Sequence, residues 1–242
     1  MTEIKNFIDI HTHILHGLDD GPKNLQESLA LARCYEISGV KRVIATPHFL
    51  PGTAWAPTKE KVLYSVQNLQ EHLDKEGIVL KIEAGMEIAY HGKMADRILA
   101  GDLLSLGNSG YYLIEPSFHG EQDNLIATVG LLLSQGIKII LAHPERIGRF
   151  QDHTELLERL VVQGTLLQIN AGSLLGCFGK KSKVMAESLA NKQLFHFIAS
   201  DAHNHDKRAP ITEQEWRALA SCSVVANVCT TCLQNIDRIF SK

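Results

Sequence analysis

Stretches with apolar residues at helical spacing alternate along this chain with short apolar runs rich in β-branched residues. Asn24 and Glu27 have the three-residue spacing of a capping box, which predicts that a helix begins there. Leu25 and Leu29 fall on one face of that helix. The helix is expected to end at Gly39, because glycine after a helix accepts the left-handed conformation that lets the chain turn back.

The same order recurs further along. A second helix is expected from Thr58 to Gly77, and two more are expected to end at Gly136 and Gly164. A β-branched or leucine-rich run follows each of these glycines. The predicted strands, about seven in number, are residues 7–11, 42–46, 78–82, 111–115, 138–142, 165–169 and 195–199.

This alternation predicts an α/β fold. Continuous apolar strands between helices indicate a parallel sheet covered on both faces. No linker, low-complexity tract or change of composition divides the 242 residues, and barrels of alternating strands and helices reach about this length as one domain. We expect a single domain over residues 1–242, a barrel or near-barrel, with a doubly wound open sheet as the alternative.

Charge and cysteine content narrow the class of protein. The net charge of −3 gives no strong field to recruit nucleic acid or an anionic membrane. The start of the chain has no secretory pattern, and no segment is apolar enough to insert into a membrane. An odd number of cysteines without regular spacing predicts reduced thiols in a cytoplasmic protein. They are Cys34, Cys177, Cys222, Cys229 and Cys232.

Histidines and carboxylates stand where the predicted strands end. In parallel α/β folds these strand ends share one face, and that face holds the active site. Side chains far apart in sequence are therefore expected to meet. They are His11, His13, Asp19–Asp20, His48, Glu87, Glu115, His143, Asp201 and His203.

Such a set predicts a metal centre. Imidazole and carboxylate ligands without thiolate suit Mn²⁺, Zn²⁺ or Fe, and their number exceeds what one ion needs. We expect two or three divalent ions, which would lower the pKa of a bound water and stabilise the oxygens of a displacement at phosphorus. Single histidines are more often surface or hydrogen-bonded residues, and this interpretation is kept for His16, His72, His91, His119, His153, His196 and His205.

Two arginines follow predicted ligands. Arg146 comes shortly after His143, and Arg208 comes one short loop after Asp201. Guanidinium groups bind phosphate through paired hydrogen bonds and stabilise its charge. We therefore interpret Arg146 and Arg208 as phosphoryl-binding residues of a metal-dependent phosphoesterase.

Several blocks resemble a known family. Residues 9–22, DIHTHILHGLDDGP, resemble the opening of the polymerase and histidinol phosphatase (PHP) superfamily. More narrowly, they resemble the bacterial PHP-type protein-tyrosine phosphatases of capsule and exopolysaccharide synthesis. Residues 45–48, 142–146, 168–173 and 199–203 resemble later blocks of that subfamily in order. The similarity extends from Ile8 to about Pro210.

The resemblance implies a distorted TIM-like (β/α)7 barrel with a trinuclear site, usually of Mn²⁺, with Fe or Zn as alternatives. It implies hydrolysis of phosphotyrosine on a cognate bacterial tyrosine kinase, and it is compatible with an oligomer. Arg146 and Arg208 would bind the phosphoryl group. By motif match, the metal ligands would be His11, His13, Asp20, His48, Glu87, Glu115, His143, Asp201 and His203.

Other functions stay open on the sequence. A small-molecule phosphatase such as histidinol phosphatase would use the same cluster, and a metal-bound partner could bind phosphotyrosine without turnover. A nuclease-like phosphodiesterase is disfavoured by the acidic net charge and the lack of a basic–aromatic stripe. Cys232 and Arg238 have the Cys-x5-Arg spacing of thiol-dependent phosphatases, but residues 233–237 contain no glycine and are predicted to be helical. Cys229 and Cys232 are interpreted as buried thiols.

Overall fold

The computed structural model describes residues 7–119 and 122–240, and strands and helices alternate along them. The elements in chain order are β1 (Ile8–Thr12), α1 (Leu25–Ser38), β2 (Arg42–Ala45), β3 (His48–Phe49), α2 (Lys59–Lys75), β4 (Lys81–Ala84), β5 (Glu87–Ala89), α3 (Met94–Leu99), η2 (Leu106–Asn108), β6 (Tyr111–Glu115), α4 (Asp123–Ser134), β7 (Lys138–Ala142), η3 (Pro144–Arg146), α5 (Gly148–Asp152), α6 (Thr154–Val162), β8 (Leu166–Asn170), α7 (Ala171–Leu175), α8 (Gly179–Asn191), β9 (Phe197–Ala199), α9 (Glu213–Ser221) and α10 (Ala226–Phe240).

All strand pairs are parallel, and they form two sheets. One sheet has the order β1-β2-β4, and the other has the order β3-β5-β6-β7-β8-β9. The sheets continue into each other along the chain, because only residues 46–47 separate β2 from β3 and only residues 85–86 separate β4 from β5. The remaining edge strands of the two sheets are β1 and β9, and an isolated parallel bridge joins Thr12 of β1 to Ala202, which follows β9.

The expected parallel α/β order is confirmed, but the expected barrel is correct only in part. In the described ranges, the strands do not form one continuous closed ladder. A proline explains one interruption, because Pro47 has no N–H to donate to a neighbouring strand. On the facing segment, the Gly85 N–H still donates to Ala45 O (2.9 Å), and a side chain at this glycine would collide with Leu106 and Ile44.

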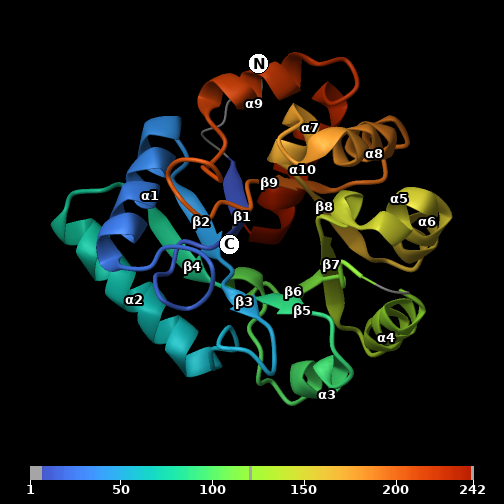
Figure 1. Ribbon diagram of the computed structural model, residues 1–242, viewed down its shortest axis with the longest axis horizontal. Coiled ribbons are helices and arrows are strands. Elements are labelled where there is room, and N and C mark those ends of the chain that lie inside the picture. Colours follow the sequence, from blue (N-terminus) through green and yellow to red (C-terminus); the bar gives the residue numbers. More distant parts are fainter. Residues whose placement is uncertain (1–6, 120–121, 241–242) are drawn as a thin grey trace.

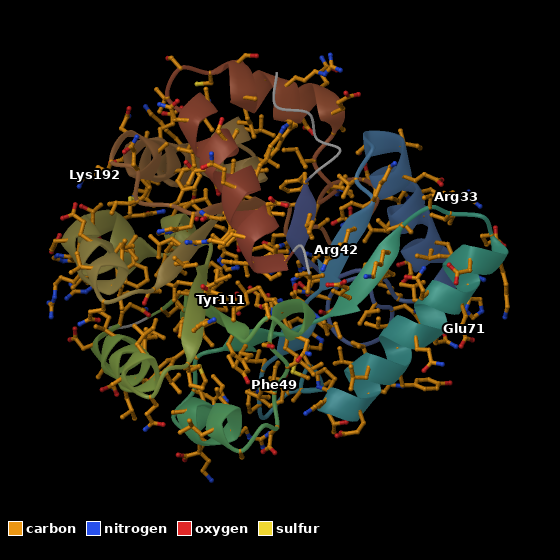
Figure 2. The ribbon with its side chains drawn as sticks, turned by 180° about the vertical axis from the view of Figure 1, so that it is seen from behind. Arg33, Arg42, Phe49, Glu71, Tyr111 and Lys192 are labelled. Carbon is orange, nitrogen blue, oxygen red and sulfur yellow. The ribbon has the colours of Figure 1, made fainter. Side chains whose placement is uncertain are left out.

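The helices surround the strands. In Figure 1 they follow each other around the molecule in sequence order, from the blue α1 and the blue-green α2 through the green α3 to the orange α8 and the red α9. Figure 2 shows Arg33 and Glu71 on the outer helices α1 and α2 and Lys192 just after α8, whereas Arg42 and Tyr111 begin inner strands. The apolar side chains between the two layers form a contiguous buried core.

The capping residues predicted for the starts of α1 and α2 have this role in the structure. The side chain of Asn24 accepts a hydrogen bond from the Glu27 N–H (3.1 Å), and Gly39 ends α1 in the left-handed conformation (φ 82°). Thr58 caps α2 in the same way.

The predicted strand at residues 78–82 begins too early, because β4 starts at Lys81. Ile78 is buried, but its N–H donates to Leu73 O (2.9 Å) at the end of α2 and not to a strand. The apolar run that begins at Ile78 therefore reflects a buried turn between α2 and β4, not the start of a strand. Among the described residues, no helix is long and apolar enough to cross a membrane.

Candidate metal centre

The structure brings all nine predicted metal ligands together: His48 and Glu87 begin the short strands β3 and β5, Asp20 lies in the loop after β1, and the other six lie within, at the end of or just after β1, β6, β7 and β9. They form four overlapping groups, and within each group one potential ligand atom per residue lies within 4.8 Å of the others. The groups are His13–Asp20–His48–His203, His11–Glu87–His143, His11–His13–Asp201 and His48–Glu87–Glu115.

Glu87 lies at the centre of the cluster and is fully buried. Its Oε2 is 3.2 Å from His11 Nε2, 3.3 Å from His13 Nε2 and 2.9 Å from His48 Nδ1. Its Oε1 is 2.8 Å from His143 Nε2. One carboxylate therefore contacts imidazoles from three different parts of the chain, as a bridging ligand would.

Two further carboxylates flank this centre. Asp20 Oδ1 lies 3.1 Å from His203 Nε2 and 3.4 Å from His48 Nε2. Glu115 lies 3.8 Å from both His48 Nδ1 and His143 Nε2. The predicted positions of Asp20 and Glu115 at the site are thus met.

Hydrogen bonds orient three of the histidine rings. His11 Nδ1 pairs with Gln168 Oε1 (2.9 Å), and His13 Nδ1 pairs with Asp19 Oδ2 (2.7 Å). His203 Nδ1 lies 3.0 Å from a backbone carbonyl oxygen. When a partner occupies Nδ1, Nε2 carries the lone pair that can bind a metal. In all three residues, that Nε2 is directed toward the cluster.

The charges in the cluster depend on one another. Burial would raise the pKa of Glu87, but the neighbouring imidazoles of His11 and His48 hold that pKa well below its ordinary value. Burial, together with the negative charge of Glu87, raises the pKa of Glu115 to about 8. A concentration of buried acceptors of this kind needs positive charge nearby.

Divalent cations fit this donor set. The Nε2 atoms of His11 and His13 are only 3.3 Å apart, and both face the same oxygen of Glu87. Imidazole and carboxylate lone pairs that converge at such distances are satisfied together by a bound cation, and nitrogen and oxygen donors suit Mn²⁺, Fe or Zn²⁺.

The backbone also adapts at the strand ends. His143 and Asp201 follow β7 and β9 with positive φ angles of 31° and 55°. This conformation is uncommon for residues with a side chain, and it often occurs at functional sites. Gly21 passes so close to His13 that an added Cβ would collide with the carbonyl oxygen of His13. The glycine of the Asp-Asp-Gly-Pro block therefore allows its loop to pack on β1.

The two predicted phosphoryl-binding arginines meet at one ligand. Asp201 Oδ2 accepts hydrogen bonds from Arg146 Nη1 (2.9 Å) and Asn170 Nδ2 (2.8 Å), and it forms an ion pair with Arg208 Nη2 (2.7 Å). Both arginines are partly exposed, with 19% and 29% of their side chains accessible. Both guanidinium groups therefore lie at the edge of the metal cluster and are partly open to solvent.

Phe178 packs against both guanidinium groups. Its ring centre lies 4.3 Å from Arg146 Cζ and 6.0 Å from Arg208 Cζ. A side chain at Gly172 would place its Cβ 2.8 Å from Phe178 Cε2 and would displace the Phe178 ring. Gly172 and Phe178 thus help to fix the position of both arginines.

Residues 7–240 match the family described as "Capsular polysaccharide synthesis, CpsB/CapC". The chain belongs to the CpsB/CapC family. The tyrosine-protein phosphatase YwqE of Bacillus subtilis is 36% identical over 197 residues, which cover 81% of this chain and 77% of YwqE. The tyrosine-protein phosphatase CpsB of Streptococcus pneumoniae is 32% identical over 218 residues, which cover 88% and 89%.

Solved structures agree with this CpsB/CapC assignment. A chain from the crystal structures of YwqE from B. subtilis and CpsB from S. pneumoniae, described as metal-dependent tyrosine phosphatases, matches with a TM-score of 0.85 at 33% identity, covering 95% of each chain. Histidinol phosphate phosphatase from Lactococcus lactis has a TM-score of 0.54 at 12% identity, covering 96% of this chain and 93% of that one, which is a likeness of fold alone.

Other side chains of this CpsB/CapC-family chain were not predicted to take part. Gln168 and Asn170 support His11 and Asp201. Their spacing of two on a strand was the signal that places both on one face. Phe178 gave no such signal, because its contact with the arginines depends on the turn of the chain after β8.

The remaining histidines and the cysteines behave as expected. In the part of the chain that the structure describes, none of the seven histidines interpreted as non-ligands belongs to the four groups. Cys229 and Cys232 are buried in α10 and unpaired. Burial raises the pKa of the Cys232 thiol to about 12, whereas a thiolate nucleophile needs a lowered pKa. The thiol-dependent mechanism is therefore disfavoured.

Proposed function

We propose that this chain is a metal-dependent protein-tyrosine phosphatase that hydrolyses phosphotyrosine on a bacterial tyrosine kinase regulating capsule or exopolysaccharide synthesis. The observation that carries the proposal is the convergence of nine metal-ligand side chains and two arginines at one strand-end face. The substrate class is supported by the names of relatives that are 30% or more identical over most of their length.

The metal centre would hold two or three divalent ions, with Mn²⁺ as the proposed metal and Fe or Zn²⁺ as alternatives. When bound, the ions would acidify a water molecule as the nucleophile and offset the charge of the phosphoryl oxygens. The residues proposed to hold them are His11, His13, Asp20, His48, Glu87, Glu115, His143, Asp201 and His203.

Arg146 and Arg208 are proposed to bind and orient the phosphoryl group. Phosphoryl transfer depends mainly on positioning and charge stabilisation. Because Asp201 and Phe178 hold both guanidinium groups in place, the two arginine side chains would lose little conformational entropy when substrate binds. The phenolic oxygen of tyrosine, with a pKa of about 10, is a better leaving group than an alkyl alcohol.

We also propose that residues 1–242 act as one domain, since the buried side chains from β1 to α10 form one contiguous cluster. The parallel strands of the two sheets would then function together as a distorted barrel around the site. Five cysteines without a disulfide support action in the reducing cytoplasm.

The experiment that tests this function is phosphate release by the Mn²⁺-loaded protein from a phosphotyrosine peptide and from histidinol phosphate. We expect a clear preference for the phosphotyrosine peptide. A preference for histidinol phosphate would assign the same site to a small-molecule phosphatase. Binding of the peptide without phosphate release would identify a regulatory partner instead of an enzyme.

A further inference from the structure

Two exposed aromatic side chains stand on the rim of the metal cluster. Phe118 follows β6, and Trp55 follows β3; their accessible fractions are 42% and 36%. Large aromatic side chains are usually buried. These two side chains are instead exposed beside a cluster of histidines and carboxylates.

Phe118 lies next to the phosphoryl-binding side of the cluster. Its ring stacks on that of His143, with ring centres 5.9 Å apart and an interplanar angle of 30°. The same ring lies 5.2 Å from Arg146 Cζ. The preceding residue fixes this turn, because the Ser117 hydroxyl donates to His119 O (2.7 Å).

Trp55 stands beside another proposed ligand. Its ring is nearly parallel to that of His48, at 14° and 5.7 Å between centres. The backbone of Trp55 is held in its turn at both ends, since its carbonyl accepts from Leu50 N–H (2.6 Å) and its N–H donates to Thr53 Oγ1 (3.0 Å). The indole is therefore presented at the site by an ordered loop.

The two rings are related through the centre of the cluster. His48 and His143 both contact Glu87, at 2.9 and 2.8 Å. Trp55 and Phe118 thus rest on two imidazoles that share one carboxylate, and Phe118 also lies against Arg146, one of the proposed phosphoryl-binding residues.

We infer that Phe118 and Trp55 bind the aromatic ring of an aryl phosphate and thereby select aryl over alkyl phosphate esters. The inference rests on the proposed function and names the specificity residues of that same site. In an aryl ester, the ring is bonded directly to the ester oxygen. A phosphoryl group held by Arg146 therefore carries its ring close to the rim, where stacking on aromatic side chains is favourable. A short alkyl ester offers no ring surface to either residue.

Two non-hydrolysable ligands test the inference by binding alone. The affinities of phenylphosphonate and methylphosphonate are measured for the Mn²⁺-loaded wild-type protein and for the Phe118→Ala and Trp55→Ala variants. We expect the wild type to prefer phenylphosphonate. Each variant should lower the ratio of the two affinities by roughly 2- to 10-fold, as expected for loss of one aromatic contact. The ratio cancels general effects of altered metal loading on phosphonate binding.

Tyr64→Ala is the matched control, because Tyr64 is an exposed aromatic residue on α2 with 63% of its surface accessible. This variant should leave the ratio unchanged. The inference is overturned if the wild type shows no aryl preference, or if both rim variants keep the wild-type ratio. If the variants lose the aryl preference but the protein releases no phosphate from phosphotyrosine, the ring site is upheld and the proposed function is rejected. If the protein hydrolyses phosphotyrosine but the variants keep the wild-type ratio, the proposed function is upheld and the ring site is rejected.

Discussion

One oxygen of Asp201 forms ion pairs with both Arg146 and Arg208, at 2.9 and 2.7 Å. The other oxygen of the same carboxylate lies 3.4 Å from His13 Nε2 within the metal cluster. Asp201 therefore links the proposed phosphoryl-binding groups to the proposed metal ligands. Any movement of this side chain would alter both parts of the site at once.

Replacing Arg208 by lysine should impair catalysis without removing metal. Lysine keeps a positive charge but cannot donate to Asp201 and to a phosphoryl group with the same fork geometry. We expect kcat/KM for a phosphotyrosine peptide to fall roughly 10- to 1000-fold, with unchanged metal content. Arg217→Lys, in an exposed ion pair with Glu213 on α9, is the control. Normal kinetics in Arg208→Lys would contradict the assigned role.

Asp19 is expected to control metal affinity without being a proposed ligand. Its Oδ2 lies 2.7 Å from His13 Nδ1 and also accepts from the backbone N–H of His48 (2.9 Å). Asp19→Asn should weaken metal binding by about 10- to 100-fold, as for other partners that orient a ligand. Metal titration measures this effect, and Asp74→Asn on the exposed side of α2 is the control. Equal metal affinity in both variants would show that Asp19 does not orient His13.

The sequence predicted which side chains meet better than it predicted the details of the fold. The clustering of His11, Asp201 and the other proposed ligands could be predicted because parallel strands end on one face, whatever their exact pairing. The division into two sheets could not be predicted, since it depends on how the strands pair on either side of Pro47.

Features that depend on loop conformation were likewise beyond the sequence. Phe118 and Trp55 are distant from each other along the chain, and no periodicity marks either as a site residue. Their positions follow from side-chain hydrogen bonds inside short turns, such as that from Trp55 N–H to Thr53 Oγ1. The strand predicted at residues 78–82 was misplaced because buried Ile78 closes a helix end.

Cys232 should be dispensable for turnover. Its Sγ lies beside the backbone N–H of Ile198 (3.2 Å), within the packing of α10 against β9. Cys232→Ala should lower the free energy of unfolding by about 1 kcal/mol and leave kcat for the phosphotyrosine peptide unchanged. Denaturant unfolding and steady-state kinetics measure the two effects. Loss of turnover in a folded, metal-loaded variant would revive the thiol-dependent mechanism.

His196 should make the fold less stable at acidic pH. Its Nδ1 accepts a hydrogen bond from the backbone N–H of Leu167 (3.0 Å), which requires an unprotonated nitrogen. Burial and then the charge of Arg238 lower its pKa from 6.5 to about 4. Between these values the unfolded chain binds a proton that the folded protein does not, so stability falls as the pH falls.

The His196→Asn variant isolates this contribution, because its side-chain oxygen can still accept from the same N–H and it does not titrate. From about pH 7.5 to about pH 5, the wild type should lose roughly 1–2 kcal/mol more unfolding free energy than the variant. Urea unfolding at both pH values gives the comparison. Identical pH dependence in the two proteins would contradict the assignment.

The central claim is that phosphotyrosine hydrolysis depends on metal held by the strand-end cluster. The most direct measurement is phosphate release from a phosphotyrosine peptide by chelator-treated protein, before and after Mn²⁺ is restored, with His13→Asn measured in parallel. The account predicts no release from the stripped protein, recovery on addition of Mn²⁺, and little recovery in His13→Asn. Undiminished release by protein shown to be free of metal would contradict it.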